Sequence, residues 1–277
     1  METEIDLQAL RETEMEIMDV IDRICRRNHL RYSLGYGTLL GVVRHGGFIP
    51  WDDDIDLIMP REDYEKLLQI WDKEAPTGYI LQNKRTNWDF TQNFTKIRKD
   101  HTTFLQGESE RTVTYHTGIF VDIFPADRVA PTRIARKKQI FLSAVNLLYS
   151  RGFTSKSGGI RELFERFLLA FPTRFRKRVY RKSEKTIGRW NNDRDAKWYV
   201  ADMIEDVYKV FDSDMFDETT DMKFEDREYQ CVRDVDGYLK VQYGDYMKLP
   251  PEEKRVYKHN HVIISLDKNL SEIEDFK

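Results

Sequence analysis

The feature that most restricts the fold is residues 52–59, an aspartate-rich run that leads directly into apolar side chains. Residues 55–59 are typical of a β-strand, in which alternate side chains share a face. Asp54 and Asp56 are therefore expected on one face, with the alternate apolar residues turned to a core. Their Cα atoms would be about 7 Å apart. Two carboxylates at that spacing can chelate one or two Mg²⁺ ions, which prefer oxygen ligands.

Two other interpretations of this run are a calcium loop and a solvated acidic turn. An EF-hand loop needs a glycine after its third acidic position and a glutamate at its twelfth. Here Leu57 follows Asp56, and Asp63 stands where the glutamate should be, so the calcium loop is excluded. The solvated turn is the remaining alternative, and the features around the run argue against it.

A third carboxylate lies within residues 118–125, which are apolar on both faces and predict a central, doubly covered strand. Asp122 is the single charge there, and burial of an unpaired carboxylate is costly. It should therefore have a cationic partner. We favour a metal ion shared with Asp54 and Asp56; the alternative is a buried ion pair with an arginine or lysine of a neighbouring element.

A glycine-rich turn, residues 35–41, follows a predicted strand and opens a short helix that ends at residues 46–47. Thr38 is expected to cap this helix. Backbone N–H groups at a helix start bind phosphate, so Gly37 and Thr38 are candidates for the phosphates of a nucleotide donor. The signal is weak alone, but the order of strand, turn, helix and aspartate-rich strand strengthens it.

Four basic residues are further candidates for the donor phosphates. Arg44 can hold a phosphate by two hydrogen bonds or form a salt bridge to Asp52 or Asp53. His45 can donate to a phosphate or cap the helix end. Lys96 and Arg98 share one face of a predicted strand, where they offset phosphate charge or lie on a solvated face.

The pattern along the chain predicts an α/β (α+β) fold. Apolar residues at helical spacing predict an amphipathic helix over residues 7–28. Strands are predicted at residues 32–36, 55–59, 79–82, 94–98 and 118–124, and mainly helices follow residue 132. We expect an N-terminal helix (1–30), a mixed-sheet core (31–128) and a mainly helical C-terminal part packed on the core (129–277).

The composition is that of a globular protein, with 40% hydrophobic and 34% charged residues. A net charge of −3 does not mark a general polyanion binder. The two cysteines, Cys25 and Cys231, are isolated, which fits a reducing compartment and indicates no zinc site. The start of the chain lacks signal-peptide features, and no run approaches the roughly 18 apolar residues of a membrane span. We expect a cytoplasmic protein.

Several blocks together resemble the LicD family of phosphocholine transferases, which shares its core with fukutin and its relatives. The longest block is residues 37–56, and further matches lie at residues 61–64, 121–125, 243–247 and 249–251. The resemblance covers roughly residues 19–255. One departure is the absence of a proline in residues 231–234, which affects acceptor-side detail rather than the core.

The resemblance implies a nucleotidyltransferase-type mixed sheet and transfer of phosphocholine from CDP-choline to a sugar hydroxyl. The acceptor would be a glycan or lipid-linked glycan precursor of teichoic acid or lipopolysaccharide type. Asp54 and Asp56 match the family's aspartates for Mg²⁺ (or Mn²⁺), and Asp122 sits where the third catalytic carboxylate is expected. Gly37 and Thr38 match the donor-phosphate turn. The alternatives are polyol-phosphate or nucleotidyl transfer on the same fold, and a non-catalytic binder of glycan or nucleotide.

Two surfaces are candidates for recognition. Aromatic faces hold quaternary ammonium groups, so Tyr36 and Trp51 are candidates for choline, with core packing as the alternative. Residues 174–185 carry a basic cluster that can meet an anionic membrane at its inner face or a lipid-linked acceptor, with a solvated helix face as the alternative. No nucleic-acid motif accompanies it, so no nucleic acid is expected. Basic residues follow the prolines at 250–251 and are candidates to approach the site from the C-terminal side, although the sequence does not place them: Lys254, Arg255, Lys258, His259 and His261.

Overall fold

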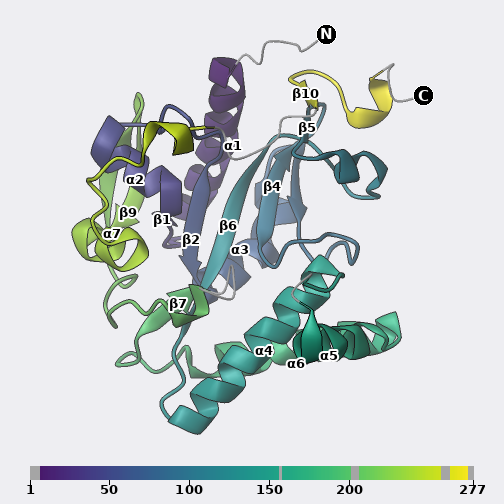
Figure 1. Ribbon diagram of the computed structural model, residues 1–277. Helices are drawn as coiled ribbons and strands as arrows, with labels where there is room; N and C mark the ends of the chain where they lie inside the picture. The colour runs from purple at the N-terminus through teal and green to yellow at the C-terminus, as the bar shows by residue number, and fades with distance from the viewer. Residues whose placement is uncertain (1–6, 156–157, 201–205, 257–262, 274–277) are drawn as a thin grey trace.

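The computed structural model describes residues 7–155, 158–200, 206–256 and 263–273, and its centre is a mixed six-stranded sheet (Figure 1). The strand order is β1-β2-β6-β4-β3, with β7 paired to β6. The strands are β1 (Ser33–Leu34), β2 (Asp56–Pro60), β6 (Phe120–Arg128), β4 (Thr95–Lys99), β3 (Tyr79–Gln82) and β7 (Trp198–Val200). Strands β2 and β6 run parallel and the other pairs are antiparallel, so the expected α/β fold with a mixed sheet is confirmed.

The two central strands are buried along most of their length. The side chains of Leu57, Ile58 and Met59 are completely buried, although Ile58 follows the two aspartates on their face of the strand. Ile58 is buried because the backbone at Gly35, directly before the helix Tyr36–His45, packs on it. A β-carbon on Gly35 would lie only 2.8 Å from Ile58 Cγ1. The face that carries carboxylates at the beginning of β2 is therefore apolar further along.

The first helices form as the sequence predicts. Helix α1 (Leu7–Arg27) buries an apolar stripe against the sheet, where α3 (Arg61–Glu74) also packs. Helix α2 (Tyr36–His45) ends at Gly46, whose φ of 72° is the left-handed conformation that glycine favours. The expected cap at Thr38 is wrong, because Gly35 precedes the helix and Thr38 lies inside it.

The C-terminal part contains the expected helices and, in addition, short strands that were not predicted. Helices α4 (Arg133–Arg151), α5 (Gly159–Leu169) and α6 (Thr173–Ile187) form a separate layer below the sheet in Figure 1. The chain then returns to the core through β7, the hairpin of β8 (Thr219–Phe224) and β9 (Arg227–Val232), and α7 (Val235–Tyr243). A further pair joins β5 (Thr103–Leu105) to β10 (Ile263–Ser265). Short 3₁₀ turns occupy Glu108–Thr112, Gly188–Trp190, Asp206–Tyr208, Glu252–Lys254 and Leu270–Glu272.

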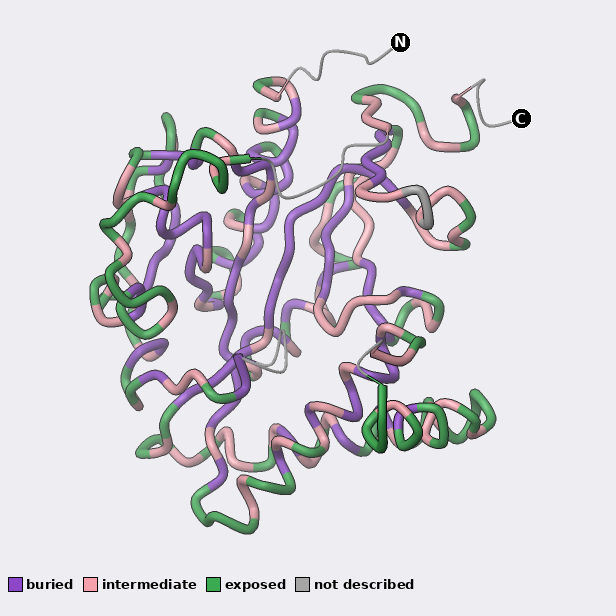
Figure 2. The backbone as a smooth tube through the Cα atoms, in the orientation of Figure 1, coloured by how far each residue is buried: buried purple, intermediate pink, exposed green. Residues whose placement is uncertain are grey.

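Burial separates the two parts of the molecule. Figure 2 shows the strands of the central sheet buried, whereas α5 is largely exposed. The main core joins α1, the central strands, the β8–β9 hairpin and α7 into one cluster. Among the helices that the structure describes, none is both long enough and apolar enough to cross a bilayer.

Candidate active site

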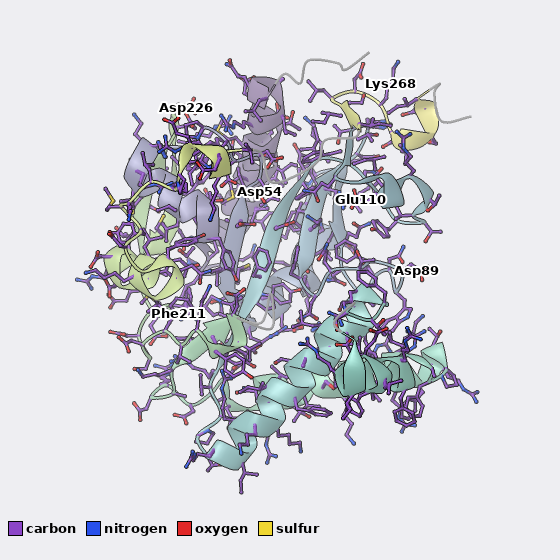
Figure 3. All side chains as sticks on the ribbon, in the orientation of Figure 1. Asp54, Asp89, Glu110, Phe211, Asp226 and Lys268 are labelled. Atoms are coloured by element: carbon purple, nitrogen blue, oxygen red, sulfur yellow. The ribbon has the colours of Figure 1, made fainter. Side chains whose placement is uncertain are left out.

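Carboxylates gather at the N-terminal end of β2. Asp52, Asp53 and Asp54 each offer one oxygen, and these oxygens all lie within 4.8 Å of one another. Asp52 and Asp53 are buried and Asp54 is half-buried, at the edge of the sheet shown in Figure 3. Burial of three carboxylates at such short range requires strong compensation from a cation, protons or hydrogen-bond donors.

The strand register brings the other two predicted carboxylates to the same place. Asp56 on β2 and Asp122 on β6 are direct partners across the parallel pair. The backbone N–H of Asp122 donates to the carbonyl oxygen of Ile55 at 2.9 Å, which fixes the two strand starts together. Asp56 and Asp122, 66 residues apart in sequence, therefore lie side by side at one end of two neighbouring strands, and Asp54 is two residues before Asp56.

Asp122 has a cationic partner within the protein. Lys96 lies opposite it on β4, and Lys96 Nζ is 2.8 Å from one carboxylate oxygen and 2.9 Å from the other. Their side chains are only 5% and 8% exposed. The buried ion pair expected as the alternative for Asp122 is thus present, and it leaves open the prediction that Asp122 also binds a metal.

Lys96 and Arg98 are both buried, so the solvated strand face is wrong for this pair. Burial lowers the pKa of Lys96, against the opposing effect of Asp122. Burial also lowers the pKa of Arg98 to about 10, and the guanidinium donates to Gln82 Oε1 and to the Gly118 carbonyl oxygen. Lys96 therefore belongs to the carboxylate site, while Arg98 braces the strands behind it.

The aspartate-rich loop is held from two sides. Arg11 on α1 donates to the carbonyl oxygens of Ile49, at 2.8 Å, and of Asp52, at 2.6 Å. On the other side α2 approaches so closely that a β-carbon on Gly37 would lie 2.4 Å from Asp52 Oδ2. A side chain at this position would displace the Asp52 carboxylate, so glycine allows the start of α2 to approach it.

The predicted donor-phosphate residues surround this loop, with roles that differ in detail. Thr38 Oγ1 accepts a hydrogen bond from the backbone N–H of Asp56 at 2.9 Å, so it positions the start of β2. Arg44 donates to the Tyr246 carbonyl oxygen at 3.2 Å, and the pKa of Arg44 is lowered by burial. Burial, then the charge of Arg44, lowers the pKa of His45 below its usual value, which favours the neutral ring.

The two aromatic candidates for choline lie in different packing groups. The Tyr36 ring meets Phe124 edge-on, with centroids 5.1 Å apart. The Trp51 ring contacts His45, and the Arg255 guanidinium lies 5.8 Å from its centroid. Arg255 thus lies beside Trp51, while Lys258, His259 and His261 lie outside the described residues.

The sequence analysis missed two residues near the carboxylates. Glu14 on α1 is completely buried, and burial together with the charges of Asp54 and Asp53 raises its pKa well above the usual value. Its carboxylate oxygens have no hydrogen-bond partner among the described residues. The available signal was its position, since Glu14 interrupts the apolar stripe of an amphipathic helix.

Tyr243, at the end of α7, is the second. Tyr243 is 41% exposed as a whole residue, but partial burial of its hydroxyl first, and then the nearby Tyr238, Asp56, Asp52 and Asp54, raise the pKa of that hydroxyl. It also belongs to a block that the family resemblance covered, yet its spacing gave no indication that it would reach β2. The turn from α7 onto α2 brings it there, since Tyr238 OH accepts a hydrogen bond from the Tyr36 backbone N–H at 3.2 Å.

The donor set suits a hard divalent cation. Asp52, Asp53 and Asp54 present only oxygen ligands, at the short range that Mg²⁺ or Mn²⁺ uses, and Asp56 and Asp122 lie at the starts of the adjoining strands. None of the described Cys side chains lies among them, because both cysteines are buried elsewhere in the core. The residues therefore fit the metal that the family resemblance implies.

Comparison with known proteins points to the same family that the sequence blocks resemble. Lipopolysaccharide cholinephosphotransferase LicD of Haemophilus influenzae is 26% identical over 261 residues, which cover 91% of this chain and 96% of that protein. Ribitol 5-phosphate transferase FKRP of Homo sapiens is 37% identical over 83 residues, 30% of this chain and 16% of that protein. The family model for the nucleotidyltransferase domain of LicD, FKTN and FKRP matches residues 29–144. These matches confirm the resemblance to the LicD family, with residues 29–144 similar to its nucleotidyltransferase domain.

Proposed function

We propose that the protein is a metal-dependent transferase that moves phosphocholine from CDP-choline to a sugar hydroxyl of a cell-surface glycan precursor. The observation that carries this is the cluster of Asp52, Asp53 and Asp54 directly before β2, next to Asp56 and Asp122, which are in register on β2 and β6. The similarity to a lipopolysaccharide cholinephosphotransferase over nearly the whole chain supports the transferred group. The residues that would hold the metal are Asp54 and Asp56, with Asp122.

The reaction exchanges one phosphorus–oxygen bond for another. The acceptor hydroxyl attacks the phosphorus that carries choline, the bond to CMP breaks, and the hydroxyl proton passes to a base. A bound divalent cation supplies charge neutralisation of the donor phosphates and a fixed orientation for them. The protein's own residues provide the helix start at Gly37, the cation Arg44, and Lys96 beside Asp122.

The positions of these groups suggest where each part of the donor binds. The start of α2 and the aspartate-rich loop are in close contact at Gly37 and Asp52, so we place the two phosphates alongside this contact rather than between the two segments. Trp51 and Tyr36 flank that region and offer aromatic faces for choline. Both cysteines are buried and reduced, which suits the cytoplasm, where nucleotide donors are available.

The experiment that tests this proposal is a donor panel. Purified protein would be given Mg²⁺, a lipopolysaccharide-type glycan acceptor, and one donor at a time: CDP-choline, a nucleotide-linked polyol phosphate, or a nucleoside triphosphate. The proposal predicts that mass spectrometry finds phosphocholine on the glycan with CDP-choline alone. Product formed only from one of the other donors would refute phosphocholine transfer and retain the fold and reaction class.

The second candidate is transfer of a polyol phosphate on the same core. It is favoured by the 37% identity to the ribitol 5-phosphate transferase over 83 residues, which exceeds the overall identity to the choline enzyme. That match covers only 30% of this chain, however, so it bears on the core and not on donor selection. A non-catalytic binder is disfavoured, because it would have little use for this group of buried carboxylates.

A further inference from the structure

Helix α5 has the reverse polarity of an ordinary surface helix. Its buried residue is Glu165, at 8% exposure, whereas Ile160, Leu163, Phe164 and Phe167 are 86%, 67%, 47% and 60% exposed. Their spacing of i, i+3, i+4 and i+7 places these four side chains on one face. We call this face the α5 stripe; it is part of the exposed helical layer in Figure 2. Contiguous exposed apolar side chains of this kind mark interaction sites.

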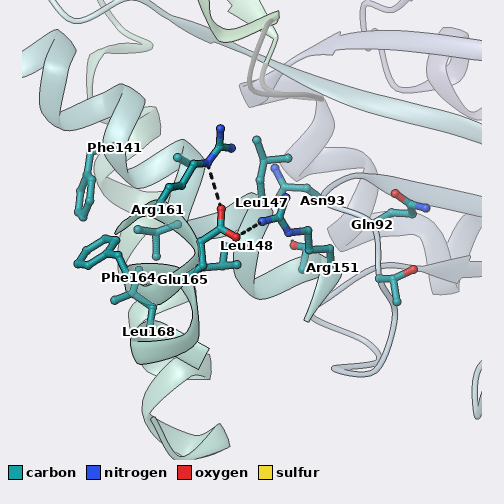
Figure 4. A pocket seen from close by; sticks show the side chains of 14 residues that line it. Gln92, Asn93, Phe141, Leu147, Leu148, Arg151, Arg161, Phe164, Glu165 and Leu168 are labelled. Atoms are coloured by element: carbon teal, nitrogen blue, oxygen red, sulfur yellow. Dashed lines mark hydrogen bonds and ion pairs between the residues drawn. The ribbon is translucent and has the colours of Figure 1, made fainter. Parts of the chain in front are cut away.

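The face of α5 opposite the α5 stripe carries Glu165, whose polar contacts hold it toward the end of α4. Glu165 lies 2.9 Å from an Arg151 nitrogen of α4 and 3.3 Å from Arg161 Nε, as Figure 4 shows. It also accepts a hydrogen bond from the Ser155 backbone N–H at 2.6 Å. Beside these contacts a largely apolar cavity of about 590 Å³ opens between α4 and α5. The contacts of Glu165 with Arg151 and Ser155 thus hold this face of α5 toward α4 and leave the α5 stripe exposed, with Phe164 at the rim of the cavity.

The α5 stripe continues into a basic helix. Phe167 contacts Phe171 with ring centroids 5.2 Å apart, and Phe171 contacts Phe175 of α6 at 4.8 Å. Residues 158–187 hold nine Lys and Arg against three Glu, a net charge of +6 in a chain whose net charge is −3. The exposed cations of α6 are Arg174, Lys177, Arg178, Arg181, Lys182 and Lys185.

We propose that the α5 stripe and α6 form a docking surface for an anionic lipid bilayer. Apolar side chains beside a dense group of cations suit the interface of such a bilayer, where the former enter the acyl boundary and the latter meet the headgroups. The strong local positive charge favours anionic lipid over an apolar protein partner. The inference does not depend on which donor the enzyme uses. The docking surface thus combines the basic cluster of α6, which the sequence indicates, with the exposed apolar face of α5.

The test is co-sedimentation with phosphatidylcholine vesicles that contain or lack phosphatidylglycerol. Wild-type protein is expected to sediment with the anionic vesicles and to be released by salt. Leu163→Glu and Phe167→Glu should each reduce partitioning at least about tenfold, because each removes buried apolar area and adds repulsion. The matched control is Ile134→Glu at the N-terminal end of α4, which is 83% exposed, outside the cavity lining, and should leave partitioning unchanged.

A second variant, Arg178→Glu with Lys182→Glu, should weaken binding to anionic vesicles without any change in the α5 stripe. Circular dichroism of each variant would verify that the fold is intact. The proposal is overturned if wild-type protein ignores anionic vesicles, or if Phe167→Glu binds them as well as wild type. A wild-type oligomer that Leu163→Glu converts to a monomer, with no vesicle binding by either, would show instead that the stripe is a protein interface. Phe167→Glu should not affect transfer to a water-soluble acceptor. The vesicle test can therefore fail without any change in the result of the donor panel, and the reverse also holds.

Discussion

The ion pair between Lys96 and Asp122 gives the sharpest prediction about the site. The substitution Lys96→Met removes the ammonium group but keeps a side chain that can pack on the Phe120 ring, whose centroid is 3.1 Å from Lys96 Nζ. Asp122 would then be a carboxylate that is 8% exposed without its cation. Loss of one partner of a buried ion pair costs about 3–5 kcal/mol. The free energy of unfolding should fall by that amount when no divalent metal is present.

The assay is urea denaturation followed by tryptophan fluorescence, in EDTA at pH 7. The double variant Lys96→Met with Asp122→Leu should recover to within about 2 kcal/mol of wild type, because an apolar pair replaces both charges. The matched control is Lys99→Met on the same strand. It breaks the ion pair between Lys99 and Glu16, whose side chains are 29% and 50% exposed, respectively. Such an exposed pair contributes at most about 1 kcal/mol.

Two results would refute this reasoning. One is a Lys96→Met protein no less stable than Lys99→Met, which would mean that Asp122 is not a desolvated anion. The other is a double variant as unstable as the single one, which would show that the loss came from packing. Either outcome would also weaken Asp122 as a member of the site.

Three further predictions concern two residues next to the aspartate-rich loop, Glu14 and Gly37, and one buried lysine beside α4, Lys84. Glu14→Gln should raise the stability of the metal-free protein at neutral pH. Because the pKa of Glu14 is raised in the folded state, the protonated Glu14 stabilises the wild-type fold fully below about pH 4.5, and this stabilisation is lost as pH rises. Equal stability of both proteins from pH 4 to 8 would contradict this prediction. Gly37→Ala should lower Mg²⁺ affinity in calorimetry by about tenfold through displacement of Asp52, and unchanged affinity would show that the close approach is not needed. Burial lowers the pKa of Lys84 to about 8, so the stability of wild type should rise relative to Lys84→Met between about pH 8 and 10.5, as the unfolded chain binds more protons there; a flat difference in melting temperature would refute it.

Local sequence was enough for the elements whose pattern is strong. The stripe of α1, the Gly46 end of α2 and strand β3 over Tyr79–Gln82 all follow from spacing or from glycine conformation. Strands β7, β8 and β9 did not, since they are short and partly polar and depend on pairing with distant segments. Thr38 was misjudged for the same reason: its hydroxyl bonds to a residue 18 positions later, not to its own helix.

The sequence predicted most of the residues of the candidate site, but not how their side chains are arranged in space. A charged residue within an apolar strand drew attention to Asp122, and the register later placed it beside Asp56. The same argument applies to Glu14, whose place in a buried helical stripe gave a usable signal. Lys96 could be recognised as a basic strand residue, but its burial and its partner depend on which strand lies next to β6. Tyr243 reaches the site through the turn from α7 to α2, which no local pattern encodes.

The central claim is that the carboxylates at the starts of β2 and β6 carry metal-dependent transfer. The most direct measurement is release of CMP from CDP-choline in the presence of a glycan acceptor, by wild type and Asp54→Asn, each with Mg²⁺ and with EDTA. The matched control is Asp89→Asn, a surface aspartate on the loop before β4. The account predicts release by wild type and Asp89→Asn with Mg²⁺, and none in EDTA or by Asp54→Asn. Equal release by wild type and a folded Asp54→Asn, or release that persists in EDTA, would contradict it.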